Sequence, residues 1–263
     1  MLNKIIDIVK EAGHLFHSKI DVFEKNTNVD IVTNVDLAIN HFLSEAFKNL
    51  HSSVLVVGEE DHNKIDFKAY EYIFIIDPID GTKNFVRNIA YSAISVGVFH
   101  NETLTYGVIY NPVTKDLYYA NKGKGSFLNG KRITVSNKAF KDSLLCTGFV
   151  IYKKEYAKIT QNILSNVYPN IDDFRRFGSA ALELAMVASG NIDLYFELRV
   201  FIWDFLAGYL LIEEAGGFIE YIELFGKVSD RKPAVLLAAN TKENLEQLKS
   251  YVLEELRNYE FNI

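Results

Sequence analysis

The first fifty residues alternate between apolar and polar positions with the period of an α-helix. In the first segment the apolar residues fall on one helical face: Leu2, Ile5, Ile6, Val9, Ala12 and Phe16. A second stripe begins near Val35 and contains Ile39, Phe42, Leu43, Ala46, Phe47 and Leu50. Asn34 stands directly before this stripe and is expected to cap the helix. The spacing of three and four residues predicts two helices that each bury one face.

Short runs of residues that favour β-strands come next. They cover positions 54–57, 72–76, 93–99, 103–110 and 117–120. Glycines at 123, 125 and 130 interrupt the pattern, and Asn129-Gly130 is typical of a tight turn. We therefore predict an antiparallel, meandering sheet covered by the two helices.

From residue 143 onward, strand-like and helix-like runs alternate. Strands are expected at 144–151, 174–177, 192–198 and 235–239, and helices at 155–164, 180–188, 205–215 and 242–256. The run at 205–215 is apolar nearly all round and ends at a pair of glycines. The pattern predicts an N-terminal α+β half over 1–139 and a C-terminal layered α/β half over 140–263. The two halves are expected to pack as one unit.

Composition and charge narrow the class of protein. The 263 residues are 49% hydrophobic and 24% charged, with 28 Lys+Arg against 34 Asp+Glu and a net charge of −6. The basic residues are scattered, so no nucleic-acid partner is expected. No apolar run is long enough to cross a membrane, and the start of the chain lacks a signal-peptide core, so a cytoplasmic protein is expected. The single cysteine, Cys146, lies in an apolar run and is interpreted as a buried hydrophobic residue.

The most informative motif follows the apolar run at 72–76. Asp77 and Asp80 are three residues apart, with Pro78 between them and Gly81-Thr82 directly after. Proline stiffens the backbone between the acids, which can then share a hard cation. Free N–H groups at Gly81 and Thr82 can bind an anion if a helix begins there. A simple turn after a strand favours the same residue types and stays open as an alternative.

Two further acids stand where an apolar element meets a loop. Glu59 follows the run at 54–57, and Asp204 precedes the apolar helix. Taken singly, they are typical of a solvated acidic loop and of a helix first-turn acid. If Glu59, Asp77, Asp80 and Asp204 converge, they form an all-oxygen cluster, which selects Mg²⁺ or Mn²⁺. Two such ions are suited to phosphoryl transfer to water.

Taken together, the ordered motifs resemble the inositol monophosphatase family, whose members are Mg²⁺-dependent, lithium-sensitive phosphomonoesterases. The matching segments are Asp30-Ile31-Val32-Thr33-Asn34-Val35-Asp36, Gly58-Glu59-Glu60, Asp77-Pro78-Ile79-Asp80-Gly81-Thr82, Gly123-Lys124-Gly125-Ser126-Phe127, Trp203-Asp204 and Glu213-Glu214-Ala215-Gly216-Gly217. They span most of the chain. The resemblance implies a five-layer α/β/α/β/α sandwich, a small phosphorylated substrate and a homodimer.

The resemblance also assigns roles to individual positions. It implies that Glu59, Asp77 and the Ile79 carbonyl hold one metal ion and that Asp77, Asp80 and Asp204 hold a second. A weaker third ion would lie near Glu59, giving two or three Mg²⁺ per site, with Mn²⁺ as a possible substitute.

Further implied roles concern the phosphate and the alcohol of the substrate. Gly81 and Thr82 would bind phosphate, and the Thr82 hydroxyl, hydrogen-bonded to Asp36, would orient and activate the water nucleophile. The alcohol end would meet a set of residues from the second half: Gly178, Ser179, Ala180, Glu197 and Asp204. Without the family, Asp36 is interpreted as a helix first-turn acid and Ser179 as an N-cap.

Lys83 departs from the inositol-specific pattern, which usually has threonine there. A lysine beside the phosphate can bind a second anionic group, and Arg175-Arg176 can reach an anionic substrate tail; a solvated lysine and an edge-strand pair are the alternatives. The predicted reaction is hydrolysis of a polyol or sugar phosphate resembling inositol 1-phosphate. Fructose 1,6-bisphosphate and 3′-phosphoadenosine 5′-phosphate are alternative substrates, and a non-catalytic metal- and anion-binding regulator is an alternative function.

Overall fold

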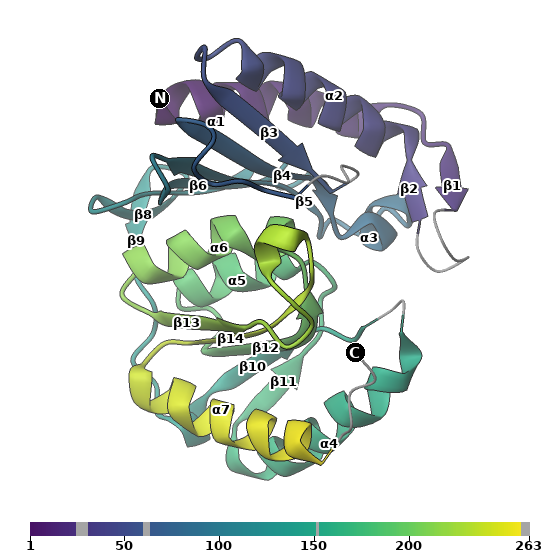
Figure 1. Ribbon diagram of the computed structural model, residues 1–263. Coiled ribbons are helices and arrows are strands. Elements are labelled where there is room, and N and C mark those ends of the chain that lie inside the picture. The colour runs from purple at the N-terminus through teal and green to yellow at the C-terminus, as the bar shows by residue number, and fades with distance from the viewer. Residues whose placement is uncertain (25–30, 60–63, 151–152, 259–263) are drawn as a thin grey trace.

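The computed structural model describes residues 1–24, 31–59, 64–150 and 153–258. Two sheets alternate with three layers of helices, as Figure 1 shows. The order is α1 and α2, the first sheet, α5 and α6, the second sheet, then α4 and α7, which confirms the five-layer sandwich. The α-helices are α1 (Leu2–Ala12), α2 (Asn34–Lys48), α3 (Thr82–Val86), α4 (Ala157–Val167), α5 (Ala180–Ala188), α6 (Ile202–Glu214) and α7 (Lys242–Arg257).

The first sheet has seven strands in the order β3-β4-β5-β6-β7-β8-β9. Their bounds are β3 (Val54–Gly58), β4 (Tyr72–Asp80), β5 (Ala93–His100), β6 (Thr103–Asn111), β7 (Asp116–Asn121), β8 (Gly125–Leu128) and β9 (Lys131–Ile133). All neighbours are antiparallel except β3 and β4, which run parallel with Gly58 opposite Ile76. The meander is as predicted, and the one parallel pair places the carboxyl ends of β3 and β4 side by side.

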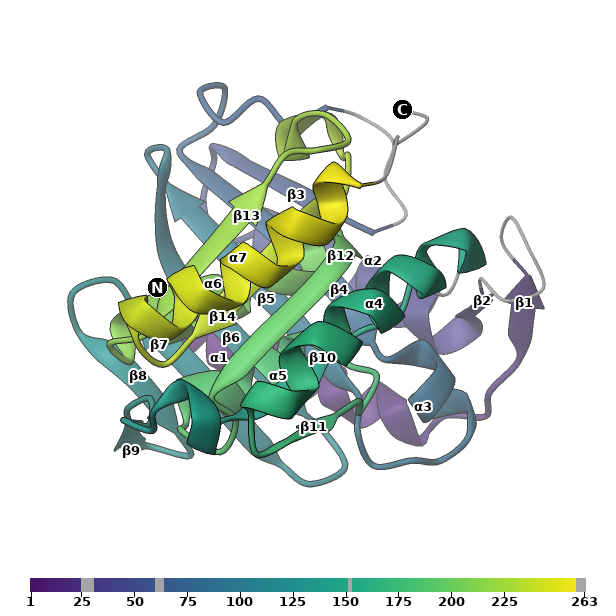
Figure 2. The same cartoon turned by 90° about the horizontal axis from the view of Figure 1, so that it is seen from below.

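The second sheet has five strands in the order β11-β10-β12-β14-β13. Their bounds are β10 (Leu144–Thr147), β11 (Asp173–Arg175), β12 (Leu194–Val200), β13 (Phe218–Ile222) and β14 (Ala234–Ala239). Figure 2 shows α4 and α7 lying over its outer face. The sequence did not predict β8, β9, β13 or the short helix α3. It also did not predict the small antiparallel pair β1 (Val22–Glu24) and β2 (Ile31–Thr33).

The apolar helix α6 is buried between the two sheets because the first sheet presents glycines to it. A Cβ atom on Gly107 would lie 2.7 Å from the Ala207 carbonyl oxygen, and one on Gly97 would lie 2.7 Å from Leu206. These positions let the helix approach the sheet backbone closely. Cys146 is fully buried, as predicted.

The cap of α2 differs from the prediction. The Thr33 hydroxyl accepts hydrogen bonds from the backbone N–H groups of Val35 and Asp36, each at 3.2 Å, and the Asp36 carboxylate accepts from the Thr33 N–H at 2.8 Å. This reciprocal capping box satisfies donors that a helix leaves unpaired. Asn34 instead accepts from the Asp21 N–H at 2.8 Å, which anchors the preceding loop.

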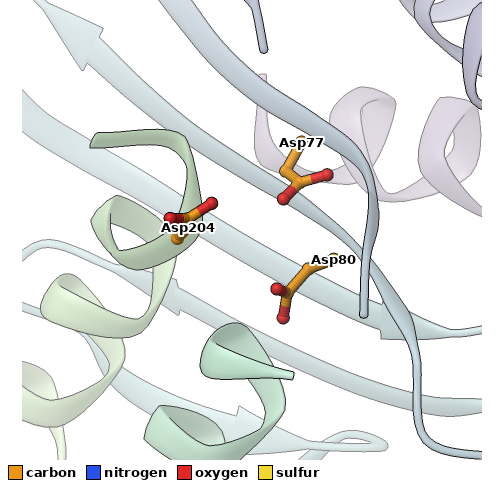
Figure 3. Close-up of side chains that lie close together, drawn as sticks. All are labelled: Asp77, Asp80 and Asp204. Carbon is orange, nitrogen blue, oxygen red and sulfur yellow. The ribbon is translucent and has the colours of Figure 1, made fainter. Parts of the chain in front are cut away.

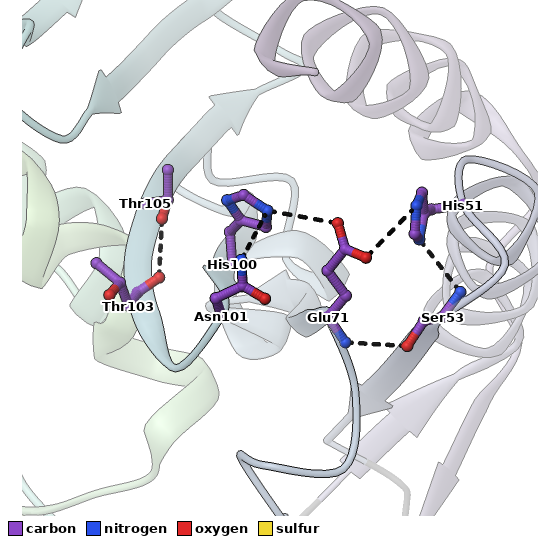
Figure 4. A network of polar contacts seen from close by, with 7 residues as sticks. All are labelled: His51, Ser53, Glu71, His100, Asn101, Thr103 and Thr105. Carbon is purple, nitrogen blue, oxygen red and sulfur yellow. Dashed lines mark hydrogen bonds and ion pairs between the residues drawn. The ribbon is translucent and has the colours of Figure 1, made fainter.

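At the other end of β4, a polar network joins three strands (Figure 4). The Glu71 carboxylate lies between His51 Nε2 at 3.6 Å and His100 Nε2 at 3.5 Å, and the Glu71 N–H donates to the Ser53 hydroxyl at 3.0 Å. The network ties the start of β3 to the end of β5. Across the described residues, the helices are all too short or too polar to traverse a lipid bilayer.

Candidate active site

Three carboxylates meet where β4 ends and α6 begins. One oxygen from each of Asp77, Asp80 and Asp204 lies within 4.8 Å of the others, and Figure 3 shows the three side chains around a common space. Asp77 and Asp80 are buried, with exposed fractions of 3% and 8%. The structure therefore brings together three of the four acids that the sequence singled out.

The end of β4 is shaped by Pro78 and by a local turn. The pairing of β4 with β5 shifts register between Asp77 and Asp80, and the Ile79 N–H donates to Asp77 Oδ1 at 3.0 Å. A register shift of this kind re-aims side chains at a strand end. Both acids consequently face the second half of the chain.

Asp80 is held by the N-terminus of α5. Its Oδ2 accepts the Ser179 hydroxyl and, at 2.8 Å, the Ala181 N–H. Burial raises the pKa of Asp80 to about 6, although these hydrogen bonds act to lower it. Ser179 also caps α5 through the Leu182 N–H at 3.4 Å, so one hydroxyl joins the helix to the acid cluster.

Asp204 lies in the first turn of α6, where its Oδ2 accepts the Phe201 N–H at 2.8 Å. Burial raises the pKa of both Asp77 and Asp204 well above the usual range, and neighbouring carboxylates raise both further. Buried acids that repel one another in this way require a cation to remain ionised together. An all-oxygen donor set of this kind fits a hard divalent ion.

Glu59 directly follows β3 and lines the same pocket. Its charge is the second cause, after burial, of the raised pKa of Asp77, as expected from the parallel pairing of β3 and β4. Asp36 is buried at 2% exposed and also raises the pKa of Asp77, but it is not among the pocket-lining residues. The motif acids Asp30 and Glu60 lie outside the described residues.

The Thr82 hydroxyl forms a different hydrogen bond from the one expected with Asp36. That hydroxyl donates to the Ile79 carbonyl at 3.0 Å, a local contact three residues back, while the Asp36 carboxylate caps α2. Local side-chain to backbone bonds of this kind are readily formed by threonine. The Ile79 carbonyl keeps a second lone pair, so the contact leaves it able to bind a cation.

Gly81 precedes α3 in a left-handed conformation with φ of 85°. A Cβ atom there would lie 3.0 Å from the Tyr91 carbonyl oxygen and 3.1 Å from that of Gly178. Only glycine fits both the backbone angle and this close approach. The N–H groups of Gly81 and Thr82 thus stand at a helix start beside the acids, where they can meet an anion.

The second half of the chain completes the pocket. Gly178, Ser179, Ala180 and Glu197 all line it together with Lys83 and the acids. The Glu197 carboxylate accepts the Tyr195 hydroxyl at 2.7 Å, and burial raises the pKa of Glu197 to about 7. Apart from Asp36, the residues to which the resemblance assigned a metal, phosphate or substrate role therefore line one pocket, whereas Arg175 does not line it.

Glu183 and Asn84 are among the pocket residues to which sequence reasoning gave no role. The Glu183 carboxylate accepts the N–H groups of Phe177 at 2.7 Å and Gly178 at 2.9 Å, and burial raises its pKa to about 8. The Asn84 amide donates to the carbonyls of Tyr91 and Phe177, each at 2.8 Å. Glu183 is the one acid inside an apolar helical run, and that signal could have marked it.

Comparison with known proteins identifies the family of this chain. Residues 2–257 match the model of the inositol monophosphatase family. The chain belongs to the inositol monophosphatase family. Members of this family are metal-dependent, and the acidic cluster is where this chain can hold a metal ion.

The relatives of this chain carry two different names. The chain is 33% identical over 260 residues to Nus factor SuhB of Escherichia coli strain K12, covering 93% of this chain and 97% of that protein. It is 32% identical over 219 residues to the inositol-1-monophosphatase of Bacillus subtilis strain 168, covering 82% and 83%.

Solved structures of the family agree in fold. The extragenic suppressor protein suhB of Bartonella henselae superposes with a TM-score of 0.84 at 29% identity, covering 95% of this chain and 97% of that one. The Thermotoga maritima IMPase gives a TM-score of 0.83 at 27% identity, covering 98% of both chains. The architecture is therefore that of the inositol monophosphatase fold.

Proposed function

We propose that the protein is a Mg²⁺-dependent phosphomonoesterase that hydrolyses the phosphate ester of a small polyol or sugar. The observation that carries this proposal is that a buried acid cluster shares one pocket with the N–H groups of Gly81 and Thr82 at the start of α3, which we call the anion cradle. The cluster attracts cations and the cradle attracts phosphate, and phosphate-ester hydrolysis is the chemistry that needs both. Family membership and the B. subtilis relative named inositol-1-monophosphatase support the same reaction class.

Divalent ions, when bound, neutralise the acids, activate a water nucleophile and stabilise the leaving oxygen. Asp77, Asp80, Asp204, Glu59 and the Ile79 carbonyl hold these ions. Burial raises the pKa values of these closely grouped carboxylates, and a bound cation would keep them ionised together.

The remaining residues bind and orient the substrate. The N–H groups of Gly81 and Thr82 donate to the phosphoryl oxygens, which develop more charge in the transition state. Glu197 accepts hydrogen bonds from hydroxyl groups of the alcohol, and Ser179 keeps Asp80 aligned through its hydrogen bond. Glu183 and Asn84 hold the 177–178 segment against the phosphate cradle.

The test is phosphate release from a panel of esters that includes inositol 1-phosphate, with Mg²⁺ or with a chelator. We expect Mg²⁺-dependent release, and we expect Asp77→Asn to lower kcat/KM by a factor of about 100 or more, as loss of a charge-stabilising group does. Full activity of Asp77→Asn would contradict the proposal. Inhibition by Li⁺ and a homodimer in sedimentation belong to the same proposal.

A non-catalytic role is the alternative, because one relative is named Nus factor SuhB. Measurable Mg²⁺ binding without phosphate release from any ester would favour a metal- and anion-binding regulator. The site argues for catalysis, since each position that the family resemblance assigns to metal or phosphate carries a suitable residue.

A further inference from the structure

Glu59 differs from the other proposed metal ligands because it lies in a turn rather than in a helix or strand. The turn directly follows β3, whose pairing with β4 ends one residue earlier. Within the described part of the chain, β3 is the edge strand of its sheet and pairs only with β4. Besides burial, the charge of Glu59 is among the causes that raise the pKa of all three acids in the cluster. Contacts from elsewhere in the fold must therefore hold this turn beside carboxylates that repel it.

Arg231 supplies such a contact from the connection between β13 and β14. Its Nη2 donates to the Glu59 carbonyl at 2.8 Å and to the Gly58 carbonyl at 3.1 Å. Hydrogen bonds from a charged donor are stronger than those between neutral groups. The bonds join segments that are 172 residues apart in the chain, and they use the backbone carbonyl of Glu59 rather than its carboxylate.

The same guanidinium also contacts the start of α6. Its carbon lies 4.5 Å from the ring centroid of Trp203, which is a favourable cation–π distance. The Trp203 ring is buried and stacks on Phe201 at 4.7 Å with an angle of 3° between the planes. Trp203 directly precedes Asp204, and the Phe201 N–H donates to Asp204 at 2.8 Å. One side chain thus joins the turn of Glu59 to the residues that position Asp204.

The backbone around Arg231 is fixed in the same region. The Ser229 carbonyl accepts the Ile65 N–H at 2.8 Å, and Lys64 pairs with Asp230 at 3.1 Å. Arg231 itself has a φ of 60°, a left-handed conformation that is costly for any residue with a Cβ atom. The hydrogen bonds and the ring contact of the guanidinium offset this cost. The strained backbone therefore serves to direct this side chain at the turn of Glu59.

We propose that Arg231 is a positioning residue for the metal site, which sets the place of Glu59 relative to Asp204 by holding the Glu59 turn against Trp203. The proposal rests on the proposed function, since it concerns the same ions. Arg231 does not line the pocket, so it acts through the ligands and not on the substrate. Residues that orient metal ligands in this way determine metal affinity. A residue that only stabilised the fold would alter the free energy of unfolding without changing the affinity of the folded protein for Mg²⁺.

Calorimetric titration of Mg²⁺ into the substrate-free protein measures this role directly. Arg231→Met keeps an apolar chain against Trp203 but removes the donors, whereas Arg231→Lys keeps a charged donor nitrogen. We expect Arg231→Met to raise the Kd for Mg²⁺ about tenfold or more, the loss typical when the partner of a metal ligand is removed. Arg231→Lys should recover part of this loss. Lys64→Gln is the matched control, because it removes the same charge from an exposed ion pair in the same region, and it should keep the Kd of wild type.

Two further measurements separate positioning from a general loss of structure. In phosphate release from inositol 1-phosphate, Arg231→Met should need about tenfold more Mg²⁺ for half its maximal rate. Its KM for the ester in saturating Mg²⁺ should stay within about twofold of wild type, because the anion cradle and Glu197 do not contact Arg231. In a protein that already carries Glu59→Gln, adding Arg231→Met should raise the Kd for Mg²⁺ less than about threefold, since the two residues act as one unit.

The possible results decide between the two proposals. A folded Arg231→Met protein with the wild-type Kd for Mg²⁺ would overturn the positioning role and leave the proposed function standing. Independent effects of Arg231→Met and Glu59→Gln would overturn it as well. If circular dichroism shows that Arg231→Met does not fold, Arg231→Lys decides, and an unchanged Kd in that variant counts against the role. Absence of phosphate release from every ester, together with the expected rise in Kd, would overturn the proposed function alone. A wild-type protein that binds no Mg²⁺ would overturn both.

Discussion

Replacing Asp77 with asparagine should change the stability of the protein in opposite directions with and without Mg²⁺. The substitution removes one charge from the cluster in which oxygens of Asp77, Asp80 and Asp204 lie within 4.8 Å of one another. It preserves shape, and the asparagine Oδ1 can still accept the Ile79 N–H, which donates to Asp77 at 3.0 Å. The effect therefore reports charge rather than packing.

The magnitude follows from the separation of the carboxylates. Two unit charges 4.8 Å apart repel by about 3.5 kcal/mol at an effective dielectric constant of about 20, and Asp77 takes part in two such pairs. Raised pKa values leave the cluster partly protonated near neutral pH, which relieves some of this repulsion. At about pH 8 and without metal, we expect the variant to be more stable than wild type by about 1–3 kcal/mol.

Added Mg²⁺ should reverse the order. An ion present at about 100 times its Kd stabilises the folded state by about 2.7 kcal/mol, and Asp77 is proposed to contact two ions. The variant should keep less than about 1 kcal/mol of this gain. Urea unfolding followed by circular dichroism, in chelator and in saturating Mg²⁺, measures both effects.

Asp66→Asn is the matched control, because Asp66 is exposed and its Oδ1 accepts the Lys68 N–H at 3.0 Å in a similar local turn. It should alter neither the stability in chelator nor the gain from Mg²⁺. A less stable Asp77→Asn protein in chelator, or an undiminished gain from Mg²⁺, would refute the reasoning.

Three further substitutions, at two positions, test how the pocket is built. The pKa of Glu183 is about 8 in the folded protein against an ordinary value of 4.5, so the unfolded chain releases the proton first as the pH rises. Wild type should therefore lose stability relative to Glu183→Gln between about pH 4.5 and pH 8, by up to about 1.4 kcal/mol per pH unit. Urea unfolding in the presence of chelator measures this difference. Glu183→Ala should lose about 2–3 kcal/mol at about pH 5, since it leaves the N–H groups of Phe177 and Gly178 without their acceptor, and a pH-independent difference between the glutamine variant and wild type would contradict the titration. Gly81→Ala should cost about 1–3 kcal/mol and raise KM, because φ is 85° and the added Cβ would lie 3.0 Å from the Tyr91 carbonyl oxygen; an unchanged melting temperature would show that the turn relaxes freely.

Local patterns in the sequence determined the elements and much of the chemistry. The meandering sheet and its covering helices were predicted from apolar stripes at helical spacing, short runs of β-favouring residues and glycine turns. These patterns are informative because the spacing of apolar residues shows which face of an element is buried. The acids at strand and helix ends were visible for the same reason, since each one stands where an apolar run stops. The ordered motifs then carried the resemblance to the family.

Tertiary structure alone decided which groups meet. Glu59 lies beside the end of β4 because β3 and β4 pair in parallel, and Asp204 reaches the cluster because glycines in the first sheet admit α6. Asp36 and Thr82 are different, because each bonds to a group only three residues away: Asp36 caps its own helix, as a first-turn acid can, and Thr82 donates to the Ile79 carbonyl.

The division has a physical cause. The spacing of apolar residues shows which face of a helix or strand is buried, and neighbouring residues in the sequence determine that spacing. A functional site depends instead on a few hydrogen bonds and contacts between segments that are far apart in the sequence. Asp80, for example, is bonded to Ser179, 99 residues away, and no spacing rule in the chain specifies that pair. Packing of α5 against the end of β4 creates it.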